Sequence, residues 1–216
     1  MVFNLSAENS VASQFLLELR DTSIQVDRAR FRKNVERLGQ ILAYEISRSF
    51  NYEPFSITTP LSTTTVNRIT SMPVLITILR AGLPFMEGFL NIFDHADCGF
   101  VGAYRDETSG EVKINVDYVA TPSIKDKELI LIDPMLATGK SLARTLELLT
   151  KREMPRSVHL ASVIAAPEGI SHVIEASKSV GCPVRIWTGS IDEKLNDKFY
   201  IVPGLGDAGD LSFGSK

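Results

Sequence analysis

The fold is decided by the stretch Leu129-Ile130-Leu131-Ile132-Asp133-Pro134-Met135-Leu136-Ala137-Thr138-Gly139-Lys140-Ser141-Leu142. Its first four residues are apolar, which is typical of a buried strand, and Asp133 stands where that strand would end. A short loop of small residues follows, and apolar residues then recur at positions 142, 146 and 149, which is helical spacing. The stretch therefore predicts a strand, a carboxylate, a loop and the N-terminus of a helix, in that order.

Such a unit suits a phosphorylated ligand. The first N–H groups of a helix have no partner within the helix, and the helix dipole is positive at that end. Thr138, Gly139 and Ser141 allow the backbone to approach a phosphate closely, and two of them add hydroxyl donors. Asp133 at the end of the strand can hold sugar hydroxyls or a metal-bound water.

Two other interpretations fit the same residues. Gly139-Lys140-Ser141 matches the tail of a Walker A loop, but that motif requires glycine at position 134, where the chain has Pro134. An ordinary strand-to-helix turn stays open on this stretch alone, because short loops of small residues are common.

Composition predicts one globular α/β domain. The chain has 216 residues, of which 44% are hydrophobic and 23% charged, enough to build a sizeable core. A net charge of −3 argues against a nucleic-acid-binding surface. No segment approaches the ~18 continuous apolar residues of a membrane span, and the first residues lack the basic start of a signal peptide. We therefore expect a cytoplasmic protein that binds neither membrane nor nucleic acid.

The cysteines and histidines show no metal-ligand spacing. Cys98 and Cys182 are far apart and form no CxxC pair, so we expect buried, reduced thiols and no disulfide. His159 lies in an apolar run and is expected to be a core histidine, not a catalyst.

Strands and helices alternate along the chain, which predicts a twisted, mostly parallel sheet flanked by helices. Residues 27–50 carry apolar positions at spacings of three and four after Asp27, a suitable N-cap. Residues 9–26 are interpreted as an arm that packs on the body or on a second subunit. Further strands are expected at 72–79, 99–104, 112–118, 129–132, 157–165 and 183–190, further helices at 84–92, 140–152 and 166–178, and short strands or a hairpin at 55–70.

A second strand–turn–helix unit places Arg80-Ala81-Gly82 at the end of the strand 72–79. In parallel α/β sheets, ligands sit at the carboxyl ends of the strands. On these residues alone Arg80 is either a ligand of an anion or a cap on a local carbonyl group. Charged residues with Ser-Gly at 106–111 predict a solvated hairpin tip between two later strands.

The tail Tyr200-Ile201-Val202-Pro203-Gly204-Leu205-Gly206-Asp207-Ala208-Gly209-Asp210 is the second informative stretch. Its glycines, proline and aspartates are not expected to form a helix or a plain strand. A calcium-binding or simply flexible loop stays open as an alternative, although EF-hand spacing is absent. A compact glycine loop exposes backbone N–H and C=O groups, which suits recognition of a flat polar ring.

Four separated motifs together resemble the type I phosphoribosyltransferases, and more narrowly the uracil phosphoribosyltransferases. They are Arg80-Ala81-Gly82, Tyr104-Arg105-Asp106-Glu107, the stretch from Asp133 to Ser141, and Gly204 to Asp210. A single acidic residue before Pro134 is a feature of the uracil branch. Two departures stand out: Lys140 where the family usually has glycine, and altered neighbours around Phe213-Gly214.

The resemblance implies a single phosphoribosyltransferase domain over residues 1–216, with an N-terminal arm (1–26), a flexible β-arm (100–120) and a C-terminal hood that binds the base (190–216). It implies transfer of the phosphoribosyl group of phosphoribosyl pyrophosphate (PRPP) to uracil, which gives UMP and diphosphate with the help of Mg²⁺. A homodimer or larger homo-oligomer and activation by GTP are properties of relatives.

The resemblance also implies roles for particular residues. Arg80, Arg105, Asp133 and Asp207 are the expected catalytic residues, with Asp207 reaching the metal through a water. Backbone groups of Ile201, Gly206 and Ala208, together with Asp207, are expected at uracil. PRPP is expected to contact Arg80, Ala81, Gly82, Arg105, Asp133, Pro134, Met135, Leu136, Ala137, Thr138, Gly139, Lys140, Ser141 and Asp207.

Lys140 is the irregular residue of this set, because glycine in that loop can adopt a positive φ and lysine does so only at a cost. Two alternatives to the uracil enzyme remain on sequence. One is a regulatory protein that keeps the fold and senses PRPP or nucleotides, and the other is the same chemistry on a different pyrimidine.

Overall fold

A computed structural model describes residues 1–106 and 113–215, with side chains for all of these except 103–106 and 113–116. Most of the predicted hairpin tip at 106–111 therefore lies outside the described residues. Among the helices that the structure does describe, none has the length and apolar composition that crossing a bilayer requires.

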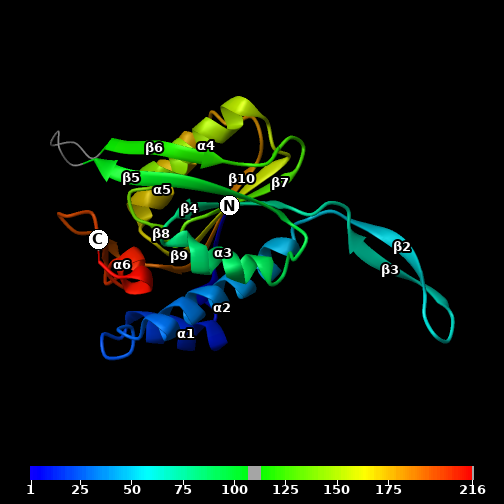
Figure 1. The fold of residues 1–216 in the computed structure, drawn as a ribbon, viewed down its shortest axis with the longest axis horizontal. Helices are drawn as coiled ribbons and strands as arrows, with labels where there is room; N and C mark the ends of the chain where they lie inside the picture. The colour runs from blue at the N-terminus through cyan, green and yellow to red at the C-terminus, as the bar shows by residue number, and fades with distance from the viewer. Residues whose placement is uncertain (107–112, 216) are drawn as a thin grey trace.

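A mainly parallel sheet forms the centre of the molecule (Figure 1). Among the described strands of this sheet, only β5 and β6 pair antiparallel, and β8 pairs with β9 beside the main order of strands. In spatial order the strands are β1 (Val2–Asn4), β10 (Val184–Ile191), β9 (Ser157–Ala165), β7 (Glu128–Ile132), β4 (Val74–Leu79), β5 (Asp97–Asp106) and β6 (Lys113–Ala120), with β8 at Met135–Leu136.

Helices cover both faces of this sheet, and two further small sheets stand outside it. The helices are η1 (Leu5–Ala7), α1 (Val11–Arg20), α2 (Arg28–Ser47), α3 (Gly82–Leu90), α4 (Lys140–Arg152), α5 (Pro167–Ser177) and α6 (Ala208–Phe213). The small sheets pair β2 (Tyr52–Thr58) with β3 (Thr63–Ile69) and β11 (Lys194–Leu195) with β12 (Ile201–Val202).

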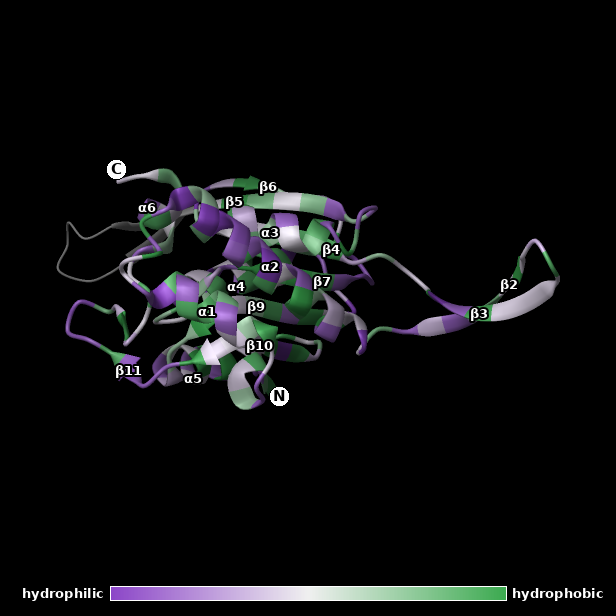
Figure 2. Ribbon diagram, turned by 90° about the horizontal axis from the view of Figure 1, so that it is seen from below, coloured by the Kyte–Doolittle hydropathy of each residue, from purple (hydrophilic) through white to green (hydrophobic). Residues whose placement is uncertain are grey.

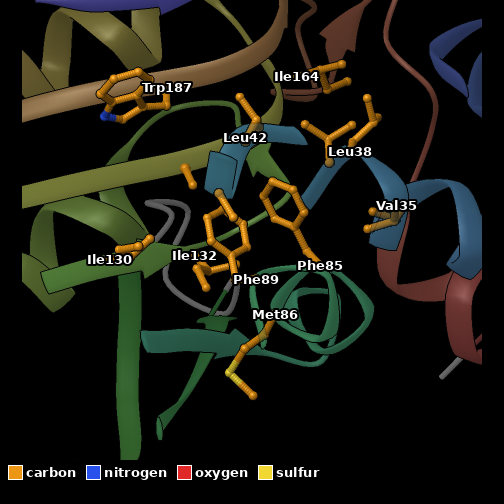
Figure 3. Close-up of a cluster of buried hydrophobic side chains, with 14 of the residues drawn as sticks. Val35, Leu38, Leu42, Phe85, Met86, Phe89, Ile130, Ile132, Ile164 and Trp187 are labelled. Carbon is orange, nitrogen blue, oxygen red and sulfur yellow. The ribbon is translucent and has the colours of Figure 1, made fainter. Parts of the chain in front are cut away.

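Alternation along β7 explains the two layers. Ile130 and Ile132 point to the core formed with α2 and α3. Figure 3 shows both in one cluster with Phe85 and Phe89 of α3. Leu129 and Leu131 point to the opposite core, formed with α4 and α5. Because both faces are buried, this strand is apolar at consecutive positions, as parallel strands usually are. The predicted α/β class is confirmed.

The order of the strands reverses between β4 and β7. The chain leaves β4 for β5 on one side, whereas β7 lies on the other side of β4 and is followed outward by β9 and β10. Residues 74–77 of β4 pair in parallel with residues 129–132 of β7, so both strands end at the same edge. The connections diverge at this point and leave a crevice, which is where open α/β sheets bind ligands.

Most predicted elements are confirmed, and their ends move by only a few residues. Helix α2 begins after Asp27, whose side chain accepts hydrogen bonds from the N–H groups of Ala29 and Arg30. The residues at 55–70 form the hairpin β2–β3, which stands away from the body as a sheet of its own (Figure 2).

Three expectations need correction. The tail was expected to avoid helix, yet a short helix begins at Ala208 with Asp207 as its N-cap. Strand β1 was not predicted, because three residues carry no periodicity and the strand depends on pairing with β10, 184 residues away in sequence, as Phe3 with Trp187 shows. Both cysteines are free, as expected, but they are only half-buried.

His159 is a core histidine, as predicted. Its Nδ1 accepts a hydrogen bond from the Trp187 Nε1–H group over 3.0 Å, so the ring proton is on Nε2. Nε2 faces Ser157 and Glu128, and Ser157 in turn donates to the Glu128 carboxylate. Burial raises the pKa of Glu128, but the hydrogen bonds from His159 and Ser157 outweigh it and leave the pKa below its usual value. The network satisfies buried polar groups at the edge of the sheet opposite the crevice.

The expected N-terminal arm packs on the body through helix α1. Leu16 and Leu19 are buried in the core, and Glu18 accepts hydrogen bonds from Arg30 Nε (2.6 Å) and Asn34 Nδ2 (2.7 Å) of α2. The hydrogen bond from Arg30, followed by those from Asn34 and Gln14, lowers the pKa of Glu18 to about 2.

Acid titration of this contact gives a first prediction. A lowered pKa means that the Glu18 carboxylate stabilises the fold above its unfolded-chain pKa of about 4.3 and loses this effect as the pH falls towards about 2. Glu18→Gln should therefore lower the urea midpoint near neutral pH, and the difference from wild type should shrink as the pH falls to about 3. Glu175→Gln, which removes an exposed ion pair to Lys178, is the matched control and should show little difference at any pH. A Glu18→Gln difference that is independent of pH would contradict the prediction.

Candidate active site

A cavity of about 470 Å³ opens at the carboxyl edge of the sheet, over the ends of β4 and β7. Two strand–loop–helix units form its floor, and the C-terminal segment forms its other wall. The predicted site residues that line it are Arg80, Ala81, Asp133, Met135, Ala137, Thr138, Gly139, Ser141, Ile201, Gly206, Asp207 and Ala208. Segments separated by more than a hundred residues thus meet at one place.

The loop after β7 is shaped by hydrogen bonds and by one glycine. Asp133 Oδ1 accepts from the Met135 N–H group over 3.2 Å, which fixes the turn out of the strand. Gly139 has a left-handed φ of 74°, and a Cβ atom there would lie 2.7 Å from the carbonyl oxygen of Gly169. Glycine is therefore required both by conformation and by the close approach of α5.

The N-terminus of α4 faces this cavity. No described side chain caps this helix, although the Lys140 N–H group donates to Thr138 Oγ1 over 3.4 Å. Gly139, Ser141 and Leu142 line the cavity beside the helix start. The exposed N–H groups and the positive end of the helix dipole make this position suitable for an anion such as a phosphate.

Lys140 does not have the backbone conformation that its replacement of glycine suggested. The positive φ belongs to Gly139, and Lys140 is the first residue of the helix. Its side chain lines a different groove of about 690 Å³ between α4 and α5, together with Arg144 and His172. The lysine is thus compatible with the loop, and its side chain lines that groove instead of the cavity.

Arg80 follows β4 after a cis peptide bond between Leu79 and Arg80. Its Nη2 lies 3.2 Å from Asp210 Oδ1, and both side chains are partly exposed. Of the two roles open on sequence, the geometry excludes the carbonyl cap for the described residues: the guanidinium contacts a carboxylate and lines the cavity.

The C-terminal wall is a compact loop between β12 and α6. Gly204 and Gly206 have positive φ values of 65° and 93°. Asp207 Oδ1 accepts from the Asp210 N–H group over 2.9 Å and so begins helix α6. Gly206 and Asp207 are exposed to the cavity, whereas Ala208 is buried behind them. The loop therefore presents backbone groups, as the glycine-rich sequence suggested.

The donor set suits a magnesium ion that arrives with its substrate. Asp133 and Asp207 both line the cavity, but the described residues contain no group of three or more His, Cys, Asp or Glu side chains able to hold a metal by themselves. Mg²⁺ typically binds through one or two carboxylates together with substrate phosphates and waters. The residues present fit this mode of binding.

Four predicted residues do not line the cavity. Gly82, Pro134 and Leu136 are buried in the same turns, and Lys140 faces outward. Arg105 is placed by its backbone near the end of β5, and its side chain lies outside the described part of the structure. Its catalytic role stays a prediction.

Sequence reasoning missed several residues that line the cavity. Phe199, Tyr200 and Ser215 carry no periodic or motif signal. Asp210 was part of the tail motif but received no role, because its contact with Arg80 joins residues 130 positions apart. A carboxylate near the end of a glycine loop was the only signal that could have indicated it.

Comparisons with known proteins agree with this geometry. A family model described as uracil phosphoribosyltransferase matches residues 7–215. A uracil phosphoribosyltransferase of Porphyromonas gingivalis is 43% identical over 216 residues, which cover 100% of this chain and 99% of the relative. A uracil phosphoribosyltransferase of Pyrococcus furiosus is 40% identical over 204 residues, which cover 93% of this chain and 85% of the relative. The structure of the AQ2163 protein from Aquifex aeolicus is 33% identical with a TM-score of 0.87, covering 100% of this chain and 99% of that one.

A parallel sheet with a phosphate-type loop at its switch point and a second loop closing the cleft is the arrangement of a type I phosphoribosyltransferase. Within that class, the chain belongs to the uracil phosphoribosyltransferase family.

The loop geometry predicts opposite outcomes at two adjacent positions. Gly139→Ala should weaken PRPP binding by about tenfold or more, because a side chain there is strained and approaches Gly169 too closely. Lys140→Ala should change the affinity less than about twofold, because the backbone of the helix start is kept. Isothermal titration of each variant with PRPP and Mg²⁺ measures both. Equal losses at the two positions would contradict this interpretation of the loop.

Proposed function

We propose that this chain transfers the 5-phosphoribosyl group of PRPP to N1 of uracil and releases UMP and diphosphate. The observation that carries the proposal is the single cavity in which an anion-binding helix start, Arg80 and the glycine loop of the C-terminal segment face one another. Membership of the family supplies the identities of the two substrates.

The first half of the cavity is assigned to PRPP. The loop from Ala137 to Ser141 and the start of α4 hold the 5-phosphate, and binding energy from this remote group positions the anomeric carbon. Asp133, at the end of β7, holds the ribose hydroxyls. Ala81 and Gly82 begin the turn into α3 beside the departing diphosphate.

Stabilisation of the leaving group is assigned to the cations. As the bond to diphosphate breaks, positive charge develops on the ribose ring and negative charge on the diphosphate oxygens. Arg80, and Arg105 by resemblance, stabilise this negative charge. Mg²⁺, held by PRPP oxygens and by Asp207 through a water, would supply further charge neutralisation when bound. A covalent nucleophile is not required.

The second half of the cavity is assigned to uracil. The base offers an acceptor–donor–acceptor edge, which backbone groups of Ile201, Gly206 and Ala208 can complement. A backbone N–H group facing C4 donates to the carbonyl oxygen of uracil, whereas the amino group of cytosine is itself a donor and would be left unpaired. The loop also orients N1 towards the anomeric carbon, which lowers the entropic part of the barrier.

The direct test is turnover. With PRPP and Mg²⁺, uracil should give UMP, and cytosine should react with a kcat/KM lower by about 10⁴ because of the unpaired amino group. Arg80→Ala should lower kcat with uracil by about 10²–10³. Chromatography of the nucleotide product measures the turnover with uracil, the turnover with cytosine and the effect of Arg80→Ala. PRPP binding without any UMP formation would contradict the enzyme and favour a PRPP-sensing regulator, and GTP added to the same assay tests activation.

We also propose that the chain forms a homodimer or a larger homo-oligomer. The strands of the β2–β3 hairpin pair with no other described strand, and Phe55 and Val66 face each other across it, both exposed. Arg68 lies over the Phe55 ring at 3.9 Å. A two-stranded hairpin is marginally stable alone in water, so contact with a second copy would stabilise it.

Replacement of this apolar pair tests the oligomer. Phe55→Ser combined with Val66→Ser should lower the mass measured by sedimentation velocity, because the exposed apolar contact is removed. Ile174→Ser on α5 is a matched control, since Ile174 is similarly exposed but lies on the body. An unchanged mass for the hairpin variant, or a wild-type chain that sediments as a monomer, would contradict the proposal.

A further inference from the structure

An ion pair at the other side of the C-terminal loop joins the beginning and the end of the chain. Arg20 ends helix α1, and Asp192 follows strand β10. The two form a bidentate pair, with Arg20 Nη1 2.7 Å from Asp192 Oδ2 and Nη2 2.5 Å from Oδ1. The Asp192 side chain is 2% exposed and that of Arg20 24%. Neither residue lines the cavity.

The same pair holds both backbone polar groups of Gly204. Arg20 Nη1 donates to the Gly204 carbonyl oxygen over 3.1 Å, and the Gly204 N–H group donates to Asp192 Oδ2 over 2.8 Å. Ser190 completes the set by accepting from Arg20 Nη2 and donating to Asp192 Oδ1. Each oxygen of the buried carboxylate thus accepts from two donors, and the geometry of Gly204 is fixed on both sides.

Gly204 is the residue at which the chain turns into the base-binding loop. Its φ of 65° is left-handed, and a Cβ atom would lie 2.1 Å from the Ile201 carbonyl oxygen. Leu205 is buried directly after it, and Gly206 then enters the cavity. At the far end of the loop, Arg32 of α2 donates to the Ser212 carbonyl oxygen over 2.7 Å. The turn at Gly204 therefore sets where the backbone of Gly206 emerges.

Burial raises the pKa of Asp192, but the hydrogen bonds from Arg20 and Gly204 outweigh it, and the pKa lies below its usual value. The carboxylate is therefore charged across the neutral range. Removal of Arg20 would leave this charge buried with only Gly204 and Ser190 as donors.

We infer that Arg20 and Asp192 are positioning residues for the base: they fix the turn at Gly204 and thereby the backbone groups that receive uracil. The inference rests on the proposed function, because it assigns the loop after Gly204 to the base. It gives the N-terminal helix a part in specificity although none of its residues lines the cavity.

The test separates the affinity for the base from the affinity for PRPP. Arg20→Ala should raise the KM for uracil by about tenfold to hundredfold, as a displaced loop would, and leave the KM for PRPP within about twofold. Arg20→Lys keeps the charge but only one point of contact, and should recover part of the loss. Asp192→Asn should raise the KM for uracil in the same direction, because Gly204 and Arg20 lose the shared charged acceptor.

Arg30→Ala is the matched control. Arg30 of α2 makes a bidentate pair with Glu18 of α1, the helix that Arg20 ends, and among the described residues it makes no hydrogen bond or ion pair with the C-terminal loop. It should lower the thermal midpoint without changing the ratio of the two KM values.

The outcomes are distinguishable. If wild-type protein forms no UMP, the proposed function fails and this inference with it. If wild-type protein is active and the Arg20 variants change both KM values together, or change only the thermal midpoint as Arg30→Ala does, the positioning role is overturned while the proposed function stands. Should Arg20→Ala not fold, Arg20→Lys and Asp192→Asn test the positioning role through the same ratio of the KM for uracil to the KM for PRPP.

Discussion

Parallel pairing of β4 with β7 is the constraint on which the rest of the structure depends. Their register, with Thr77 opposite Ile132, brings both strands to an end at the same edge of the sheet. Arg80 and Asp133 follow within one to three residues, so a guanidinium and a carboxylate line the same cavity at this edge. Because the two connections then diverge, the space above them stays open for a ligand. The apolar core on both faces leaves the strand ends as the place where charged groups can gather.

Charge in the cleft bears on the part that a magnesium ion would have in the proposed mechanism. Asp133, Asp207 and Asp210 face a single described guanidinium, that of Arg80. In the proposed mechanism, a magnesium ion that arrives with PRPP would offset part of the negative charge of the diphosphate beside Asp207 and Asp210. The Arg80–Asp210 contact is partly exposed, and such pairs are worth only about 0–1 kcal/mol, so a diphosphate can replace Asp210 at little cost. Release of Asp210 would then remove a contact of α6, which directly follows the loop assigned to the base.

Sequence patterns predicted those parts of the fold that local periodicity determines. Apolar runs gave β4, β7 and β9, and the N-cap Asp27 gave the start of α2. The placement of Arg80 at the ligand-binding edge of the sheet followed from the rule for parallel strand ends, and the loop after Gly204 from its composition and its resemblance to a family. For Lys140 the sequence left open whether the loop tolerates a lysine, because sequence alone could not show that the left-handed residue is Gly139.

What could not be predicted depends on contacts between distant segments. Strand β1 and the Asp210 partner of Arg80 leave no periodic trace in the residues around them. The same holds for Arg20, which in sequence is simply a basic residue near the end of a helix, where it would be expected to interact with the last carbonyl groups. Its position against Asp192 depends on β10 ending beneath α1, and β10 in turn is covered by β1 at its open edge.

The N-terminal strand and helix thus complete the side of the sheet on which the C-terminal loop rests. The loop assigned to the base presents backbone groups, so besides its own buried Leu205 and the capping Asp207 it needs neighbouring segments to fix its geometry. The buried ion pair meets that need because it combines two fixed donors with two fixed acceptors.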